Sequence, residues 1–520
     1  MSEPKKVDRR KFIYAGLGAV ALIAIGAAAY VAMNPPVVTQ TVTTSTTVPT
    51  TSVVTTTVPT TSVVTTTIPT TSVVTTTTTA PSGKKVLRWL TTETATASME
   101  VFKKWINEYT TTHPDVEIQL EATSWDEIYT KILSAVAAGT GYELLHAVNY
   151  NVVMLAKMDL LLPVDEIIKL NTGPGRTPDE DYFPYTRVVI NGHDYMVPYR
   201  TGPQFIWYRK DLFTKYNLSI PSTYDELLNC AKTLNGKDGV YGYGLPLGRG
   251  GLTQELFTNF VMGNGCKFYV DWVDGRWDTT LDKSPWREKV KETLLFYKEL
   301  MKYAPPDCGT YSYNEVINSY VYGKVAMANY AGRLLVNLEN TNPDLGSKTS
   351  AFGFPVGPGW KDDPLGIIKT YDTMGGLRFG PQPIFSYGWC VMKNSKYPYE
   401  ALDFIAYCSR HEKNLELWNT VPLHEMPAIK SQREVGWYLE NPILKKHPDV
   451  LKFSDEYEAK GSYTWFAPRG PNGPLFPAVG QLFGTLIITD MVQAVCLKNT
   501  NPDQAIDEAA TKIKELLKQT

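Results

Sequence analysis

From residue 84 onward, apolar residues recur first at the spacing of a strand and then at the spacing of a helix, and this change repeats along the chain. The apolar run 86–90 predicts a strand, and the helix predicted after it has one apolar face, formed by Met99, Phe102, Trp105, Ile106 and Tyr109. Alternation over 116–120 predicts a second strand. A second helix follows over 128–136, and 144–148 is predicted as a third strand. This β-α-β-α-β order is typical of an α/β fold with mainly parallel sheets.

Residues 12–33 break this pattern, because they form one uncharged, mostly apolar run of 22 residues. A helix of that length is about 33 Å long at about 1.5 Å per residue, which is enough to cross a hydrocarbon core of about 30 Å. The segment 1–11 carries five basic residues, and no charged residue follows the run until Lys84. This asymmetry predicts a cytoplasmic N-terminus and an extracellular location for the rest of the chain.

Two interpretations of the apolar run remain open. It is longer than the core of about 7–15 residues found in signal peptides, which favours a retained transmembrane anchor. A signal peptide cleaved at small residues such as 27–29 is the alternative. Residues 8–13 also resemble a twin-arginine export signal, although Asp8 and Tyr14 depart from its usual flanking residues. The same arginines are equally explained as positive-inside charges.

Residues 34–83 form a segment that cannot bury a core. Between residues 39 and 79, 27 of 41 positions are Thr or Ser, and the sequence repeats with a period of ten residues. This composition is typical of a surface stalk that carries O-linked sugars. As a flexible coil the segment would reach about 40 Å, and as a stiff, extended chain about 150 Å. We therefore expect the stalk to hold a domain near the membrane but clear of its surface.

The remaining 437 residues, 84–520, are too many for a single core, so two lobes are expected. They carry 46 basic and 51 acidic residues, which leaves no basic footprint for nucleic acid. The six cysteines include no CxxC pair, which argues against a zinc or thioredoxin-like motif. Outside the cell they allow up to three disulfides, whereas export of an already folded chain is equally consistent with buried free thiols.

Six groups of residues in this region resemble the motifs of one protein family and follow that family's order. Pro221-Ser-Thr-Tyr-Asp-Glu-Leu227 is close to Pro-x-Thr-Trp-Asp-Glu-Leu, and 323–327 with Gly332 is similar to a Gly-Lys-Ala-Ala-Met strand and its glycine turn. In 159–164, Asp159 replaces a Gly, which is tolerable because Asp enters left-handed backbone more readily than most residues. The other matching segments are 139–145, 207–213 and 387–404. The chain is therefore similar to the family-1 extracellular solute-binding proteins of ABC transporters, the class that includes maltose-binding protein.

The resemblance covers 84–520 and implies a two-lobed clamp of the periplasmic-binding-protein type, with the ligand in a cleft between α/β lobes. Lobe 1 is expected at about 84–200 and 361–412, and lobe 2 at about 201–360 and 413–520. Independently of the family, ligands of open α/β sheets bind beyond the carboxyl ends of the strands. Closure of two hinged lobes would exclude water around the solute.

This fold gives candidate ligand-binding residues at strand ends and lobe crossings. Three follow the first strand and could equally cap the next helix, and three follow the third strand. One tyrosine and one arginine lie at the first lobe crossing, a second arginine lies in lobe 2, and either arginine could instead form a surface ion pair. The candidates are Thr91, Thr92, Glu93, Asn149, Tyr150, Asn151, Tyr199, Arg200 and Arg333. Large planar rings suit the apolar faces of sugars. Trp389 and Trp465 are predicted in the cleft because they lie among Gly, Pro and polar residues rather than on a periodic apolar face.

The sequence predicts a binding protein rather than an enzyme, with no metal or cofactor. His424-Glu425 lacks the second histidine of a zinc-protease helix, no Gly-x-Ser-x-Gly occurs, and the six histidines have no metal-ligand spacing. We expect a membrane-anchored, extracellular protein that captures a sugar or oligosaccharide for the permease of an ABC importer. A peptide, polyol or other solute is the alternative ligand, and a secreted carbohydrate-active enzyme with two carboxylates or a purely structural surface protein is the alternative function. Asn217, in the only Asn-x-Ser/Thr sequon, is the predicted N-glycosylation site.

Overall fold

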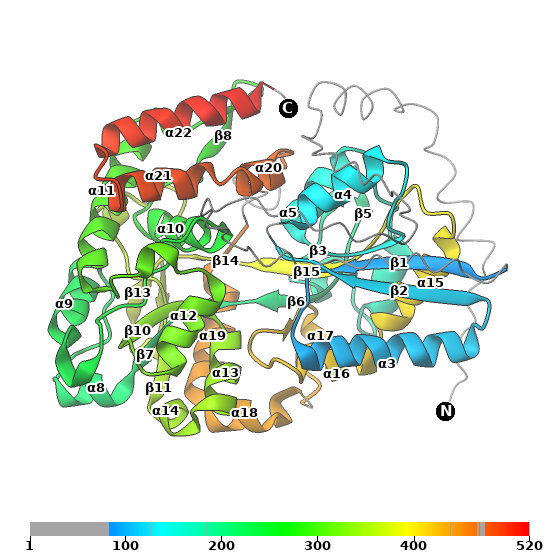
Figure 1. Cartoon of the computed structure of the whole chain (residues 1–520), viewed down its shortest axis with the longest axis horizontal. Coiled ribbons are helices and arrows are strands. Elements are labelled where there is room, and N and C mark those ends of the chain that lie inside the picture. The colour runs from blue at the N-terminus through cyan, green and yellow to red at the C-terminus, as the bar shows by residue number, and fades with distance from the viewer. Residues whose placement is uncertain are drawn as a thin grey trace, which may run out of the picture.

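Two lobes, each built on its own β-sheet, make up the part of the chain that the computed structural model describes (Figure 1). The described residues are 83–518 without 126, 184, 437, 465, 466 and 468–473. The predicted basic segment, the apolar run, the stalk up to residue 82 and Trp465 lie outside them. The structure therefore bears on the predicted globular domain and not on the predicted anchor.

The sheet of lobe 1 has six strands, in the order β16 (Met426–Pro427), β6 (Val197–Gly202), β15 (Phe385–Val391), β3 (Leu144–Val148), β1 (Lys85–Thr91) and β2 (Val116–Ala122). β1 pairs in parallel with both β2 and β3, and α3 (Thr96–Thr112) and α4 (Ile128–Ala137) connect these strands, so the predicted β-α-β-α-β order is confirmed. β15 runs antiparallel to β3 and β6. The sheet is consequently mixed, and the prediction of mainly parallel sheets holds only for its first three strands.

The apolar face predicted for α3 packs into lobe 1. Phe102, Trp105 and Tyr109 are buried, and Met99 and Ile106 lie partly buried against the same core. α3 packs beside α15 (Pro398–Cys408) and α16 (His411–Trp418). The other helices of this lobe are α5 (Asn149–Lys157), α6 (Asp165–Asn171), α7 (Pro178–Asp181) and α17 (Lys430–Arg433).

Lobe 2 has a smaller, antiparallel sheet. Its order is β10 (Met327–Ala331), β7 (Gln204–Arg209) and β11 (Thr349–Phe352). Single-residue bridges of Tyr241 to Val325 and of Gly244 to Ala328 extend it in parallel. The helices of this lobe are α8 (Lys210–Lys215), α9 (Tyr224–Leu234), α10 (Gly251–Gly263), α11 (Trp286–Leu300), α12 (Tyr313–Val321), α13 (Arg333–Thr341), α14 (Pro343–Ser347), α18 (Pro442–Lys446), α19 (Pro448–Gly461), α20 (Val479–Gly484), α21 (Ile487–Cys496) and α22 (Pro502–Leu517).

Four short strand pairs lie outside these two sheets. They are β4 (Val189–Ile190) with β5 (His193–Asp194), β8 (Val270–Val273) with β9 (Arg276–Thr279), β12 (Lys369–Tyr371) with β13 (Leu377–Phe379), and β14 (Gln382–Pro383) with β17 (Ser462–Tyr463). β14 leads directly into β15, so this last pair marks the point where the chain leaves lobe 2.

The lobe boundaries expected at 361 and 413 are wrong. The ring of Tyr371 in β12 contacts Phe453 and Tyr457 of α19, so the chain stays with lobe 2 until about residue 383. Farther on, β16 pairs with β6, and the indole N–H of Trp418 donates to the carbonyl of Tyr199 at 2.9 Å, so 413–433 stays with lobe 1. In its described part the chain crosses between β6 and β7, between β14 and β15, and between α17 and α18.

The described part of the chain has one stretch that is long and apolar enough to cross a membrane, Val479–Cys496, and 67% of it is buried inside the fold. Leu486, in left-handed backbone (φ 56°), separates α20 from α21 within this stretch. The apolar residues of this stretch therefore pack into the core of lobe 2.

All six cysteines are buried, and none forms a disulfide. This arrangement agrees with the free-thiol alternative. Burial raises the pKa of these thiols, that of Cys308 to about 11, so they stay protonated and unreactive at neutral pH.

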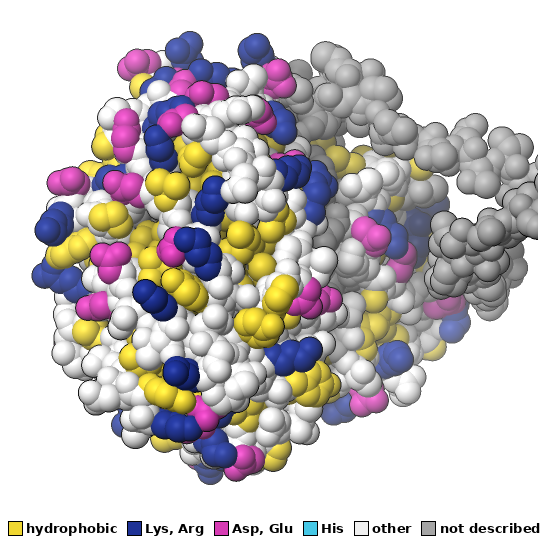
Figure 2. Space-filling model, turned by 60° about the vertical axis from the view of Figure 1, so that its left-hand side comes forward, with side chains coloured by type: hydrophobic (Ala, Val, Ile, Leu, Met, Phe, Trp, Pro, Cys, Tyr) yellow, Lys and Arg dark blue, Asp and Glu magenta, His cyan; other side chains and the backbone are white. Residues whose placement is uncertain are grey.

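Charged side chains of both signs are interspersed on the face shown in Figure 2, and neither sign gathers into one patch there. Such a surface has no extended basic stripe of the kind that binds nucleic acid.

Candidate functional site

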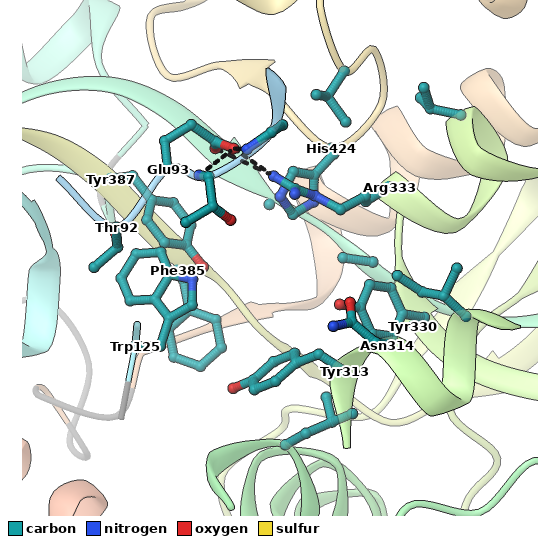
Figure 3. Close-up of a pocket in the computed structure, with 18 of the residues that line it drawn as sticks. Thr92, Glu93, Trp125, Tyr313, Asn314, Tyr330, Arg333, Phe385, Tyr387 and His424 are labelled. Carbon is teal, nitrogen blue, oxygen red and sulfur yellow. Dashed lines mark hydrogen bonds and ion pairs between the residues drawn. The ribbon is translucent and has the colours of Figure 1, made fainter. Parts of the chain in front are cut away.

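A cavity of about 610 Å³ lies between the two lobes (Figure 3). Lobe 1 lines it with the loops after β1 and β2, the ends of β6 and β15, and the turn after α16. Lobe 2 lines it with α10, α12, β10 and α13. The cavity thus lies beyond the carboxyl ends of β1 and β2, where an α/β sheet is expected to bind ligands.

The loop between β1 and α3 is held by the carboxylate of Glu93. One of its oxygens, Oε1, accepts hydrogen bonds from the backbone N–H groups of Thr94 (3.1 Å) and Ala95 (2.9 Å). The hydroxyl of Thr91 accepts one from the backbone N–H of Glu93 at 3.0 Å. These contacts fix Glu93 and Thr92 at the cavity wall.

Glu93 also forms an ion pair with Arg333, and this pair joins the two lobes across the cavity. Nη2 of Arg333, the first residue of α13, lies 3.0 Å and 3.2 Å from the two carboxylate oxygens of Glu93. Burial alone would raise the pKa of Glu93, but the charges of Arg333 and Arg200 lower it overall. Glu93 is therefore ionised.

Arg200 lies in the wall of the cavity with its guanidinium stacked 3.6 Å from the centre of the Tyr387 ring. Its Nε donates to the hydroxyl of Tyr199 at 3.1 Å and lies 3.9 Å from a carboxyl oxygen of Glu425. Burial raises the pKa of Glu425 to about 8. Arg200 is thus buried as a cation beside a carboxyl group that remains largely protonated at pH 7.

Aromatic rings from both lobes surround the open space. Trp125, in the loop after β2, meets Tyr387 edge-on at a ring separation of 5.3 Å. Figure 3 shows Trp125, Phe385 and Tyr387 on one side and Tyr313 and Tyr330 on the other. Rings set in this way offer flat apolar surfaces to a ligand that enters between the lobes.

Polar groups of lobe 2 line the same cavity. Glu255 of α10 accepts a hydrogen bond from the side-chain amide of Gln204, and burial raises the pKa of this carboxyl group to about 8. Asn314, Asn337 and Asn340 add amide groups from α12 and α13. Hydroxyl groups of a ligand would find both donors and acceptors here.

Five of the candidates chosen from the sequence line the cavity: Thr92, Glu93, Tyr150, Arg200 and Arg333. Thr91 and Tyr199 lie behind it, where they contact the two ring nitrogens of buried His146 at 3.0 Å and 3.2 Å. Asn149 and Asn151 are buried on α5 and do not line it. Trp465 lies outside the described residues.

Trp389 does not line the cavity, in contrast to the expectation from sequence. Its side chain is 1% exposed and stacks on Tyr199 at 4.7 Å inside lobe 1. The reason is the direction of β15, which runs antiparallel to β3, so that its beginning lies at the cavity. Phe385 and Tyr387 occupy that end of the strand, and Trp389 lies two residues farther into the core.

Several residues that line the cavity were not predicted from the sequence, among them Trp125, Glu255, Tyr313, Tyr330, Phe385 and Tyr387. Trp125 had a usable signal, since it lies between the second predicted strand and the helix after it, and ligands of open α/β sheets bind beyond the carboxyl ends of strands. Tyr387 had the same alternation as Trp389. The residues of α10 and α12 had no local signal, because only the packing of the lobes brings them to the cavity.

Within the part of the chain that the structure describes, no group of three or more His, Cys, Asp or Glu side chains could hold a metal ion.

Comparison with known proteins agrees with this arrangement. A family model for bacterial extracellular solute-binding proteins matches residues 91–414. A relative from Brucella abortus (strain 2308), named only as a binding protein, is 22% identical over 417 residues, 78% of this chain and 87% of the relative. The mannitol-binding protein of Pseudomonas aeruginosa is 25% identical over 256 residues, 47% of this chain and 55% of that protein.

The fold is also found in solved structures. Maltose-bound MalE3 of T. maritima is similar with a TM-score of 0.65 and 19% identity, over 83% of this chain and 100% of that chain. At this identity the likeness shows the fold alone. The family model covers more than half of the chain, and we conclude that the protein belongs to the bacterial extracellular solute-binding proteins, a family of binding proteins rather than enzymes.

Proposed function

We propose that this protein captures a sugar, an oligosaccharide or a polyol outside the cell and presents it to the permease of an ABC importer. The observation that carries the proposal is the combination of aromatic rings and amide or carboxyl groups around one cavity between two lobes. Rings cover the apolar faces of a sugar while polar groups take its hydroxyls. The volume of about 610 Å³ lies within the range of about 300–1,000 Å³ that is usual for small-molecule sites.

The similar proteins support the same ligand class. One of them is named for mannitol, and another was solved with maltose. A polyol and a disaccharide share closely spaced hydroxyl groups, which fit the carboxyl and amide groups of this cavity. Capture by closure requires that the closed state binds the ligand more tightly than the open state. Because residues of both lobes line one cavity, a ligand contacts both sets only when the lobes are closed, and this gives the closed state its higher affinity.

We further propose that residues 12–33 anchor the protein in the membrane and that 34–83 form a glycosylated stalk, with 84–520 as the binding domain. The apolar run and the Thr-rich repeat support this arrangement. Asn217, the proposed N-glycan site, is exposed at the end of α8. Intact-mass measurement of the native protein tests these modifications, because the bare polypeptide mass would contradict them.

Thermal-shift and calorimetric screening against sugars, polyols and peptides tests the proposed function. A ligand at 100 times its Kd adds about 2.7 kcal/mol to the free energy of unfolding. Trp125→Ala should weaken binding about tenfold or more, since the ring covers one side of the cavity. Trp360→Ala is the matched control, because Trp360 is also half-buried but lies outside the cavity. Binding of a peptide alone, or chemical conversion of a bound sugar, would overturn the proposal.

A further inference from the structure

Two guanidinium groups, those of Arg200 and Arg333, line the same cavity although like charges repel strongly in a buried site. Both lie close enough to His424 and Glu93 to act on the charge of each. Burial lowers the pKa of His424, which also lines the cavity, and both arginines lower it further. Both arginines also favour the ionised form of Glu93, against the effect of burial. Such a concentration of positive charge requires a negative partner.

Glu93 is the partner that the protein itself supplies, and its carboxylate is already fully engaged. It accepts hydrogen bonds from two backbone N–H groups and from Nη2 of Arg333. The Nε and Nη1 groups of Arg333 form no hydrogen bond or ion pair with another described residue, and its side chain is 22% exposed. Arg333 therefore retains N–H donors for a ligand in the cavity.

Arg200 stands behind it in the wall. Its Nε is used by Tyr199, its Nη1 lies 3.5 Å from the carbonyl of His424, and its Nη2 has no partner among the described residues. The Tyr387 ring covers one face of the guanidinium. This leaves an immobilised cation whose Nη2 can donate a charge-assisted hydrogen bond to an oxyanion.

The remaining acids do not balance the two arginines. Apart from tyrosines, the ionisable side chains among the described residues that line the cavity are those of Glu93, Glu255, Arg200, Arg333 and His424. Burial raises the pKa of Glu255 to about 8 and keeps His424 neutral. Glu425, beside Arg200, is largely protonated for the same reason. Among the described residues, the one carboxylate that is hydrogen-bonded to either arginine is thus that of Glu93, while Glu425 lies 3.9 Å from Arg200 with neither of its oxygens hydrogen-bonded. A ligand with one negative charge would complement this arrangement.

We propose that the physiological ligand is an acidic sugar, such as a hexuronate or a short oligosaccharide that contains one, and that Arg333 binds its carboxylate with Arg200 in support. The proposal rests on the proposed function as a sugar binder and narrows it to one ligand class. Charge on the ligand, rather than the number of its hydroxyls, would then decide which sugars are captured.

Matched pairs of ligands test this directly. The full-length chain, purified in a detergent without a sugar headgroup, is titrated calorimetrically with D-galacturonate and D-galactose, and with α-1,4-digalacturonate and α-1,4-galactobiose. D-glucuronate and D-glucose form a third pair. We expect at least one acidic sugar to bind ten times or more tightly than its neutral partner, with a preference that decreases as salt is added.

Arg333→Gln should reduce that preference to threefold or less. The readout is the ratio of the two affinities within each pair, because both sugars lose the contact of Arg333 with Glu93 alike. Arg333→Lys, which keeps the charge but loses the planar fork, should retain part of it. Arg249→Gln is the control, because Arg249 is also ion-paired, to Asp490 at 2.9 Å, but lies outside the cavity. The unfolding temperature of each variant shows whether it is folded.

The outcomes separate the two proposals. Equal or tighter binding of the neutral sugars by the wild-type protein would overturn the acidic-sugar inference and leave the sugar-binding function standing. A preference that survives in Arg333→Gln would remove Arg333 from the site. If no sugar of the panel bound while a peptide did, both the inference and the proposed function would fail.

Discussion

The α-carbon of Gly332 lies so close to the carbonyl group of Leu423 that a β-carbon at position 332 would be 2.3 Å from its carbon and oxygen atoms. Gly332 belongs to lobe 2, between β10 and α13, whereas Leu423 follows α16 in lobe 1. Glycine is required here by the close approach of the two lobes, directly beside the Glu93–Arg333 ion pair.

Gly332→Ala should therefore force the lobes apart at this point and weaken ligand binding about tenfold or more, while each lobe stays folded. Calorimetry with the best ligand and small-angle scattering measure the two effects. Gly309→Ala is a suitable control, because its β-carbon would meet only the flexible side chain of Leu497 at 3.4 Å. Wild-type affinity in Gly332→Ala would show that the contact is not needed for closure.

Replacement of Trp389 should affect stability rather than binding. Trp389→Ala removes a ring that stacks on Tyr199 and meets Trp89 edge-on in the core, a change that typically costs about 3–5 kcal/mol. Tyr387→Ala should show the reverse, with affinity reduced about tenfold and a smaller loss of stability. Chemical unfolding and calorimetry of both variants distinguish the roles, and a large loss of affinity in folded Trp389→Ala would contradict this assignment.

The contrast between these two residues shows where sequence reasoning stops. Alternation along the strand assigns Tyr387 and Trp389 to one face of the sheet. Which of the two lies at the cavity and which in the core depends on β15 running antiparallel to β3. That pairing joins segments more than 200 residues apart. β1, β2 and β3 were predicted because their signals are local. The pairing of β16 with β6 has no local signal, and neither does the approach of α12 to the cavity.

Glu255 should make the stability of the protein depend on pH. Its pKa is about 8 in the folded protein and about 4.3 when unfolded, so between these values the folded state holds a proton that the unfolded state releases. The contribution of Glu255 to the free energy of unfolding is fully present below about pH 4 and is lost as the pH rises toward 8. Unfolding temperatures of wild type and Glu255→Gln should thus diverge from pH 5 to pH 8, with the wild type falling behind.

The exposed Glu508, on α22, provides the control for this measurement. Glu508→Gln should follow the wild type at every pH. A temperature difference between wild type and Glu255→Gln that does not change with pH would show that Glu255 is ionised in the folded protein.

The fragment 84–520 should be soluble and fold without the segments before it. β1 begins at Lys85, whose backbone N–H donates to Asp115 and whose ammonium group pairs with Asp115 and Glu400, so truncation after residue 83 leaves the first strand intact. A single cooperative thermal transition of the purified fragment is the expected result. Aggregation, or the absence of such a transition, would mean that the domain boundary lies elsewhere.

Two of the three crossings between the lobes lie side by side, since Phe385 pairs with Gly202 and the backbone N–H of Gln204 donates to the side chain of Gln382 at 2.8 Å. They form a two-stranded link between the lobes, so a rotation of one lobe relative to the other has to bend both strands together. A ligand that touches residues of both lobes would thus act on one shared hinge.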